Sequence, residues 1–389
     1  MSKEPEKKSR KIRVQFRKNR TEKTRITDWT RKFDNAEQGE IDTERNERIS
    51  GKGDLFKRRT VIGKTLPSDT VDGQGFEVIP EIDLNKCKQG RVLRVFGLNS
   101  DVETDDGQIH HCVTRRILKT LATDQRHVVV AGDRVSFRPA DQVDEHRREG
   151  IIERVEPRKG TIARSSRNKQ HIIVTNVDRI VIVSSAAEPQ IKPNLIDRFI
   201  LTAERSGIKP IICINKVDLI DIAELLPLVG VYSQLGYKVI LTSHVTGLGI
   251  NRLKTILTNR ESVLVGQSGV GKSSLLNAVE PSLNLRVGEV SEENEKGRHT
   301  TTTAELLKLS FGGYVVDTPG IRQFALWDVI PEEVSGFFRD IRPFENHCRF
   351  PDCSHTHEQD CAVKNGVADG KIDLRRYESY LAIRAGDET

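Results

Sequence analysis

The sequence SVLVGQSGVGKSS, residues 262–274, joins a short apolar run to a glycine-rich turn and then to the start of a helical pattern. The spacing from Gly266 to Gly271, Lys272 and Ser273 is that of the phosphate-binding loop G-x-x-x-x-G-K-S. Glycines let consecutive backbone N–H groups face phosphate oxygens at the positive end of the following helix. Lys272 is expected to act in catalysis by reaching the β- and γ-phosphates, and the Ser273 hydroxyl to bind Mg²⁺. The residues predicted to surround the phosphates are Gly266, Gln267, Ser268, Gly269, Val270, Gly271, Lys272, Ser273 and Ser274.

Composition limits the class of protein. The chain has 389 residues, a formal net charge of +6, and 36% hydrophobic against 30% charged residues, a length that allows two or three domains. The sequence contains no apolar run near the roughly 18 residues of a membrane helix, and residues 1–20 lack the apolar stretch of a secretory signal. Three of the six cysteines fall within Cys348–Cys361, which does not suggest a disulfide framework. We therefore expect a cytoplasmic protein without a membrane partner.

Positive charge is concentrated near the amino-terminal end, where residues 1–32 hold 13 Lys and Arg against 4 Asp and Glu. The aromatic residues of residues 1–86 are isolated and too few to build a core, so we predict a basic, disordered extension. A basic arm suits phosphate backbones, but it also keeps a protein in solution. The sequence leaves both roles open.

Short strand-like runs separated by turn residues extend from Lys88 to Pro157. Strands are predicted at residues 91–96, 102–104, 109–113, 127–130, 134–138 and 150–155. Roughly five strands in so short a segment are typical of a small barrel, and an oligonucleotide-binding (OB) fold is favoured for residues 87–158. Basic residues in this segment indicate RNA binding: Arg91, Arg94, Arg115, Arg116, Lys119, Arg126, Arg134 and Arg138.

Strand and helix patterns alternate from Thr161 onward. Buried strands are predicted at 179–184 and 211–214, with a helix between them that Asn194 caps and Gly207 ends. Further helices are predicted at 221–235 and 249–258, and further strands at 237–241, 304–311 and 314–317. This alternation is typical of a doubly wound α/β domain with a mostly parallel sheet, here residues 159–335.

The stretch Asn215-Lys216-Val217-Asp218 follows one predicted strand and matches the requirements of a guanine base. The Asp218 carboxylate can accept from N1–H and the exocyclic amine of guanine, a pair that adenine does not offer. The Asn215 amide can reach N7, and the stem of Lys216 can lie over the base. Ser243 follows the next strand, where a loop contacting guanine O6 is expected.

A second group of predicted nucleotide ligands follows the phosphate loop. Asp317 ends a predicted strand and can hold Mg²⁺ through water, while the Gly320 N–H can sense the γ-phosphate during catalysis. The polar stretch Gly297–Thr302 contains three consecutive threonines, one of which can supply a hydroxyl to Mg²⁺. Thr301 is the candidate we name, although the pattern does not separate it from its two neighbours.

The order of these motifs is informative, since the base-recognition elements precede the phosphate loop and Asp317. Ordinary GTPases carry them in the opposite order. Joining the ordinary chain ends and opening the chain after Asp317–Gly320 gives the order found here. We therefore predict a circular permutation, which folds tolerate where the termini lie close together.

The spacing Cys348-x₄-Cys353-x-His355-x₅-Cys361 offers three thiolates and one imidazole. Such a Cys₃His set leaves no obvious position for water, so it predicts one structural zinc ion. His347 and His357 are alternative ligands.

Taken together, the motifs resemble the RsgA/YjeQ family of circularly permuted GTPases that depend on the small ribosomal subunit. The resemblance runs from about Gly90 to Tyr380 and covers the barrel segment Gly90–Gly97, the nucleotide motifs and the cysteine pattern. It implies a multidomain chain: an N-terminal OB-fold barrel, a central α/β P-loop GTPase domain and a C-terminal zinc-binding helical domain, here residues 336–389. It implies hydrolysis of GTP to GDP, stimulated by the small (30S) subunit late in its maturation, with 16S rRNA as a contact.

Two residues bear on the implied mechanism. Ile321 stands where Ras-like enzymes carry the glutamine that orients water, and the resemblance implies His299 as a catalytic substitute. A solvent-facing loop histidine is the alternative. Gly269 occupies the position of the asparagine through which some GTPases hold K⁺, so the sequence leaves K⁺ dependence open.

We expect a monomer that is released from the subunit on hydrolysis. A GTP-regulated RNA-binding switch and a generic P-loop ATPase are the rival functions. Asn215 and Asp218 argue against the ATPase.

Overall fold

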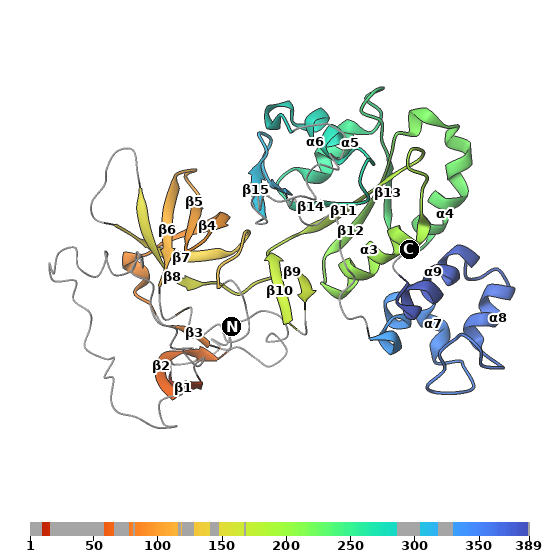
Figure 1. Cartoon of the computed structure of the whole chain (residues 1–389), viewed down its shortest axis with the longest axis horizontal. Coiled ribbons are helices and arrows are strands. Elements are labelled where there is room, and N and C mark those ends of the chain that lie inside the picture. Colours follow the sequence, from red (N-terminus) through yellow and green to blue (C-terminus); the bar gives the residue numbers. More distant parts are fainter. Residues whose placement is uncertain are drawn as a thin grey trace, which may run out of the picture.

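The computed structural model of the chain describes residues 10–15, 58–65, 78–80, 82–115, 118, 128–140, 148–166, 169–285, 304–317 and 330–387. Figure 1 shows a barrel of strands beside an α/β layer, with a helical carboxyl-terminal part below that layer. In the described ranges, no helix has the length and apolar character needed to cross a bilayer.

The barrel is built from β4 (Lys88–Phe96), β5 (Asn99–Thr104), β6 (Ile109–Thr114), β7 (Arg134–Pro139) and β8 (Glu149–Val155). Their order is β4-β5-β6-β8-β7, and β7 returns to β4, so the barrel closes. Neighbouring strands are antiparallel except β6 and β8. Val92, Val102, Phe137 and Ile152 are fully buried inside. This arrangement confirms the predicted OB-fold barrel.

One predicted barrel strand is wrong. The described part of residues 127–130, Val128–Val130, forms no strand. The Asp133 carboxylate accepts a hydrogen bond of 2.9 Å from the Val130 N–H, which closes a buried turn. The apolar run therefore reflects burial of this turn.

Strand β4 pairs both within the barrel and with the α/β layer. Its first half pairs with β7, its register shifts between Val92 and Arg94, and Arg94 then lies opposite Glu305 of β15 (Glu305–Lys308). Leu93, at the shift, packs against the core of the α/β layer. The barrel and the α/β layer thus share one continuous sheet.

The α/β sheet has the order β13-β12-β11-β14-β16-β15. Its strands are parallel except β15. The strands are β11 (Arg179–Ser185), β12 (Lys209–Asn215), β13 (Lys238–Leu241), β14 (Glu261–Val265) and β16 (Tyr314–Asp317). The helices are α3 (Pro193–Arg205), α4 (Leu226–Gln234), α5 (Ile250–Leu257) and α6 (Lys272–Val279).

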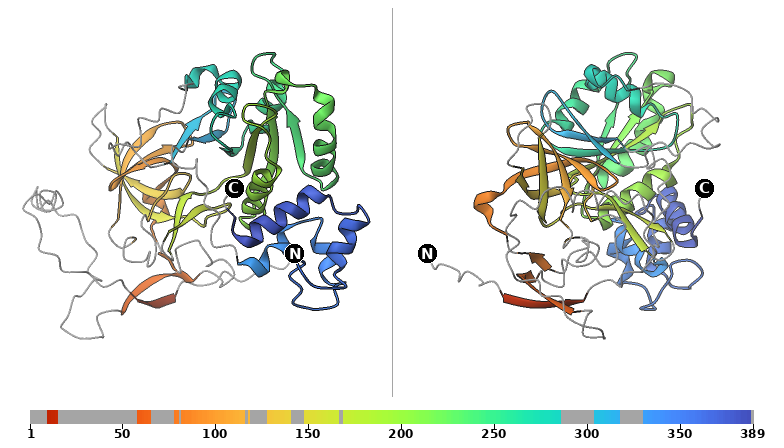
Figure 2. Two further views of the ribbon diagram at one scale, coloured as in Figure 1. Left: turned by 45° about the vertical axis from the view of Figure 1, so that its right-hand side comes forward. Right: turned by 60° about the vertical axis from the view of Figure 1, so that its left-hand side comes forward.

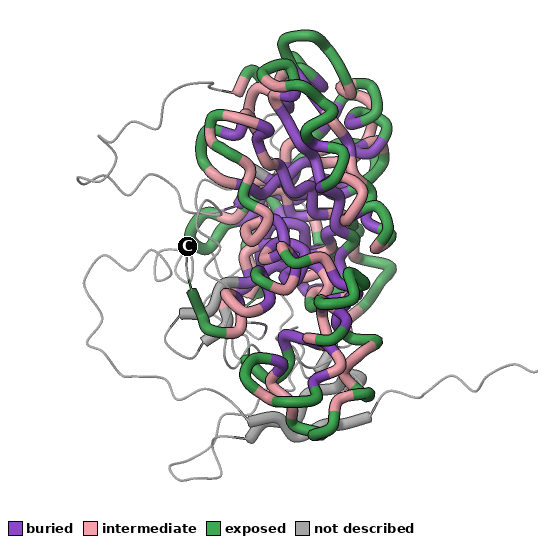
Figure 3. Tube along the Cα trace, turned by 90° about the vertical axis from the view of Figure 1, so that its right-hand side faces the viewer, coloured by how far each residue is buried: buried purple, intermediate pink, exposed green. Residues whose placement is uncertain are grey.

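Helices cover both faces of this sheet. Ile180 and Ile182 of β11 pack in the cluster with α3 and α4, whereas the alternate residues Val181 and Val183 pack with α5 and α6. This alternation is the two-residue period of a strand that is buried on both faces. Figure 3 shows the buried residues concentrated along the middle of the molecule.

Two helix boundaries differ from the predictions. Helix α3 begins at Pro193 with Lys192 as its N-cap, so Asn194 does not cap it, because proline favours the first helical position. The predicted helix at 221–235 is divided into a 3₁₀ turn (Ile222–Leu225), which Asp221 caps, and α4, with Pro227 in its first turn. An antiparallel hairpin of β9 (Ile162–Ser166) and β10 (Lys169–Val174) was not predicted.

Three strands occur in the predicted disordered extension: β1 (Arg10–Gln15), β2 (Arg58–Thr65) and β3 (Val78–Pro80). They form an antiparallel sheet in the order β1-β2-β3, and β3 lies against β8 of the barrel. Figure 2 shows these strands at the opposite end of the molecule from α5 and α6. The structure thus has strands in part of the segment for which disorder was expected. The pairing of β1 with β2 joins residues more than forty positions apart, which a local sequence pattern does not reveal.

The carboxyl-terminal part contains 3₁₀ turns at Pro331–Glu333 and Ser335–Phe337, then α7 (Arg342–Glu345), α8 (Ala362–Ala368) and α9 (Leu374–Ala385). Its apolar core includes Leu201, contributed by α3. Arg376 of α9 is buried and donates to the Asp340 carboxylate at 3.0 and 2.9 Å. It also donates at 2.5 Å to Asp197 of α3, so this buried guanidinium joins the helical part to the α/β layer.

Candidate nucleotide and metal sites

The phosphate loop lies between β14 and α6, at the carboxyl edge of the parallel sheet. Gly266, Gly269 and Gly271 adopt φ values of +148°, +78° and +89°. A Cβ at Gly266 would lie 2.0 Å from the Val183 carbonyl oxygen, so no side chain fits there. Residues 267–270 form the turn, and Lys272, Ser273 and Ser274 open the helix. The Lys272 ammonium donates to the carbonyl oxygens of Gly266 and Gln267 at 2.8 and 2.7 Å, which holds it over the loop.

Asn215, the last residue of β12, connects the predicted base motif to this loop. Its side chain is fully buried and donates from Nδ2 to the Val270 carbonyl oxygen at 2.9 Å. The Thr242 hydroxyl donates to its Oδ1 at 3.2 Å. A Cβ at Gly271 would lie 2.5 Å from the Asn215 amide nitrogen, so glycine permits this close approach. Thr242 was not predicted as part of the site, because it belongs to no recognisable motif.

The remaining base-motif residues meet at the same edge. The Ser243 hydroxyl is hydrogen-bonded to the Asp218 carboxylate and lowers the pKa of that carboxyl group. Ser243 is buried, and its hydroxyl also accepts from the Thr246 N–H at 3.2 Å. The two predicted loops are therefore in contact, and the Asp218 residue at their contact is exposed to solvent.

The segment between β11 and α3 was not selected by the sequence analysis. Lys216 has a left-handed φ of +58°, and its ammonium donates to the Glu188 carbonyl oxygen. Gln190, Lys192 and Phe199 line a small pocket together with Gln267 of the phosphate loop. This segment therefore forms one wall of the region around the loop.

Five residues predicted for nucleotide binding or catalysis lie outside the described residues, as does Ile321: His299, Thr300, Thr301, Thr302 and Gly320. The backbone of Asp317 is described. It ends β16, which pairs in parallel with β14, the strand that leads into the phosphate loop.

The predicted zinc ligands converge in the carboxyl-terminal part. One ligand atom from each of Cys348, Cys353, His355 and Cys361 lies within 4.8 Å of the others. The His355 Nδ1 is 3.5 Å from both the Cys348 and the Cys361 sulfur. Burial lowers the pKa of His355, which favours the neutral imidazole that metal binding requires. Three sulfurs and one ring nitrogen at this spacing fit a tetrahedral zinc ion.

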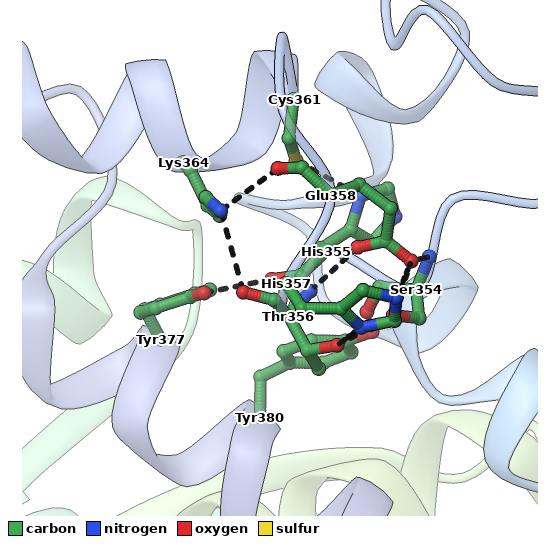
Figure 4. A network of polar contacts seen from close by, with 9 residues as sticks. All are labelled: Ser354, His355, Thr356, His357, Glu358, Cys361, Lys364, Tyr377 and Tyr380. Carbon is green, nitrogen blue, oxygen red and sulfur yellow. Dashed lines mark hydrogen bonds and ion pairs between the residues drawn. The ribbon is translucent and has the colours of Figure 1, made fainter.

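The surroundings hold this cluster in place (Figure 4). The hydroxyls of Tyr377 and Tyr380 on α9 donate to the carbonyl oxygens of His355 and Ser354, each at 2.7 Å. The side chains of the alternative ligands make other contacts: the His347 Nδ1 lies 3.2 Å from the Pro343 carbonyl oxygen, and the His357 Nδ1 lies 2.9 Å from the Thr356 hydroxyl.

Many of the basic residues that indicated RNA binding by the barrel are engaged in ion pairs within the protein. Arg91 and Arg134 pair with Glu261 of β14, and Arg94 pairs with Asp101. Arg115 and Arg138 both pair with Glu153. Arg116, Lys119 and Arg126 lie outside the described residues.

The barrel meets the α/β layer through a second buried carboxylate. Glu103 of β5 accepts from the Lys308 ammonium at 2.6 Å and from the Tyr314 hydroxyl at 2.5 Å. The Arg91 guanidinium lies 4.2 Å from the centre of the Tyr314 ring. These contacts reach β15, which follows the predicted Mg²⁺-binding stretch Gly297–Thr302, and β16, which leads into Gly320.

Comparison with known proteins gives consistent matches. A model of the RsgA GTPase family matches residues 155–327. The small ribosomal subunit biogenesis GTPase RsgA of Yersinia enterocolitica is 39% identical over 314 residues, covering 78% of this chain and 87% of that protein. The protein of the same name from Histophilus somni is 38% identical over 301 residues, covering 76% and 83%.

Two crystal structures are also similar. YjeQ from Thermotoga maritima gives a TM-score of 0.63 at 35% identity, covering 77% of this chain and 98% of that one. YloQ, described as a circularly permuted GTPase, gives a TM-score of 0.60 at 28% identity, covering 78% and 96%. Almost all of the YjeQ chain is thus accounted for, while this chain has residues without a counterpart there.

Proposed function

The chain belongs to the RsgA GTPase family, and from this premise we propose that it hydrolyses GTP as a maturation factor of the small ribosomal subunit, bound to 16S rRNA and released on hydrolysis. The observation that carries the nucleotide assignment is the contact between Asp218 and Ser243, beside the hydrogen bond from Asn215 to Val270. One edge of the sheet would thereby present a guanine-selective carboxylate next to a phosphate loop.

The nucleotide would use the elements of this edge in the manner of other P-loop GTPases. Residues 266–274 would surround the phosphates, and Lys272 would leave its two carbonyl partners for the β- and γ-phosphates. Ser273, Thr301 and Asp317 would hold Mg²⁺, the first two directly. Gly320 would contact the γ-phosphate, and His299 would take the place of the absent glutamine.

Zinc is proposed for the Cys₃His cluster. The ion would link Cys348, Cys353, His355 and Cys361, and its chemistry would be structural because the four protein ligands leave no open position. Tyr377 and Tyr380 would keep the His355 loop in the orientation that the ion needs.

We also propose one role for each of the three domains. Residues 87–158 would contact rRNA, 159–335 would bind and hydrolyse GTP, and 336–389 would carry the zinc ion. The protein would act as a cytoplasmic monomer.

GTP turnover with and without purified small subunits tests this function. We expect slow hydrolysis by the protein alone and faster hydrolysis with small subunits, since Ile321 cannot orient water. Purified large subunits at the same concentration are the control. Equal turnover with both subunits, or binding without stimulation, would contradict the proposal and favour an RNA-binding switch.

A further inference from the structure

Positive charge gathers at the amino edge of the parallel sheet, where its strands begin. Arg179 begins β11, Lys209 begins β12 and Lys238 begins β13, three neighbouring strands. Arg179 lies directly opposite Lys209, and Lys238 lies opposite Ile211, two residues further along β12. Residues that are opposite one another, or two apart along a strand, lie on the same face of a sheet. The three cations therefore share one face.

Helix α5 adds a fourth cation to this group. Val181, two residues after Arg179, packs in the same apolar cluster as α5, so the shared face is the one that α5 covers. The Arg179 guanidinium donates to the carbonyl oxygen of Ile256, near the end of α5. Desolvation lowers the pKa of the Lys238 ammonium, and three neighbouring cations lower it further: Arg252, Arg179 and Lys209. We call Arg179, Lys209, Lys238 and Arg252 the basic cluster.

The charge of the basic cluster is largely uncompensated. Lys209, Lys238 and Arg252 are exposed, and none of them pairs with a carboxylate in the described ranges. Asp178 lies near Arg179, but its carboxylate already accepts a hydrogen bond of 3.0 Å from a backbone N–H. By contrast, the described arginines of the barrel discussed above are paired with carboxylates. The cluster is thus a source of free positive charge apart from the barrel.

The chemistry of this surface suits a nucleic acid better than a protein. Among the described residues, none of the large hydrophobic side chains that are exposed belongs to β11, β12, β13 or α5. Protein interfaces typically have an apolar or aromatic centre and are depleted in lysine. Lys and Arg neutralise phosphates and need no apolar contact to do so. The phosphate backbone of RNA is therefore the partner that the cluster fits.

We propose that the basic cluster is an RNA-binding surface, which contacts the phosphate backbone of rRNA apart from the barrel. This proposal names a contact surface for the rRNA partner and in that respect rests on the proposed function. The cluster lies at the opposite edge of the sheet from the predicted nucleotide site. Lys209 begins β12 and Asn215 ends it, about 20 Å away from the rise per residue of a strand. The surface therefore contributes to RNA affinity and leaves the hydrolysis of GTP by the free protein unaffected.

The test uses the full-length protein and matched double variants. Lys209→Gln with Lys238→Gln removes two charges from the basic cluster, whereas Lys209→Arg with Lys238→Arg keeps both charges in place. Lys254→Gln with Lys371→Gln removes two lysines outside the cluster, which have an aromatic ring and a carboxylate as partners. The probe is rRNA extracted from small subunits and freed of protein. Affinity is measured by filter binding between about 50 and 300 mM KCl.

The salt dependence reports how many phosphate contacts are lost. If Lys209 and Lys238 both contact phosphates of single-stranded RNA, the slope of log affinity against log salt falls by about 1.4 in the glutamine variant, and affinity at 0.1 M salt falls about 25-fold. The arginine variant and the Lys254/Lys371 variant should stay within about threefold of the wild type, because both keep the charge of the cluster. Arg252→Gln alone should lower the slope by about 0.7, which tests the cluster without changing a strand. GTP turnover without subunits should be unchanged in each variant.

Three results would overturn the proposal. Equal losses in the two glutamine double variants would assign binding to the net charge of the protein, and unchanged affinity would remove the surface altogether. A loss on intact subunits but not on free rRNA would identify a ribosomal protein as the partner. Subunit-stimulated GTP turnover of the wild type, measured in parallel, tests the proposed function separately, because its absence leaves the comparison on free rRNA intact.

Discussion

Replacing Arg376 with alanine should separate the carboxyl-terminal helices from the α/β layer. Its side chain is 2% exposed and pairs with Asp197 and Asp340, whose side chains are 0% and 6% exposed. Without the guanidinium, the Asp340 carboxylate loses its buried cationic partner, and Asp197 keeps the Tyr232 hydroxyl at 2.9 Å. Removing one partner of a buried ion pair costs about 3–5 kcal/mol.

Hydrogen exchange of the α9 amides measures this effect locally, which suits a multidomain chain without a single unfolding transition. A loss of about 3–5 kcal/mol corresponds to exchange faster by roughly 160- to 5,000-fold. Arg375→Ala is the matched control, because this neighbouring arginine pairs with Asp373 at the surface and its side chain is 40% exposed. Such a pair contributes about 1 kcal/mol or less. Less than tenfold acceleration in the Arg376 variant, or equal acceleration in both, would refute the reasoning.

The other predictions concern the nucleotide site, the barrel contact and the metal cluster. Asp218→Asn should lower the affinity for GTP and raise the affinity for xanthosine triphosphate, because the new amide can face the O2 of xanthine. Competition binding measures this change, and a variant that still prefers GTP would reject the base assignment. Lys272→Ala should abolish GTP turnover while zinc content stays unchanged, and residual wild-type turnover would exclude its catalytic role. Burial raises the pKa of Glu261 from 4.5 to about 7 against the opposing effect of Arg91, so the folded protein holds the proton more tightly than the unfolded chain. Stability should therefore fall by up to about 3 kcal/mol as pH rises from 4.5 to 7, and Glu261→Gln should remove that part of the pH profile in denaturant titrations. Chelation should release one zinc ion per chain, and Cys353→Ser should lower the metal content. Metal analysis that finds no zinc in the wild type would contradict the cluster assignment.

The predictable parts of the fold were those with local signals. The phosphate loop combines fixed glycine spacing with a strand before it and a helix after it, so its place between β14 and α6 follows from sequence. The cysteine spacing likewise predicted the metal cluster, because its four residues lie within one short segment. Asn215 was selected for the base, but its hydrogen bond to Val270 depends on a fold that brings β12 beside the loop.

What escaped prediction depends on pairs distant in the chain. Glu103 meets Lys308 and Tyr314 only because β4 joins the barrel to β15, and no property of these residues alone indicates the partner. The basic residues of the barrel indicated a nucleic-acid surface, yet Arg91 lies against Glu261 inside the protein. Charge counts in a sequence do not distinguish exposed cations from those that hold two layers together.

The pairing of β4 with both the barrel strands and β15 has a consequence for the synthesis of the chain. The barrel strands lie within residues 88–155, whereas the rung from Arg94 to Glu305 joins positions 211 apart. At roughly 5–20 residues per second, the ribosome needs about 8–30 s to move from the end of β8 to the end of β15. During that interval the barrel can close, while Leu93 and Arg94 of β4 still lack β15 as a neighbour. An unpaired edge invites association with other nascent chains, and a bulge followed by a charged residue is a common protection. The register shift between Val92 and Arg94, followed by the charged Arg94, is a feature of this kind.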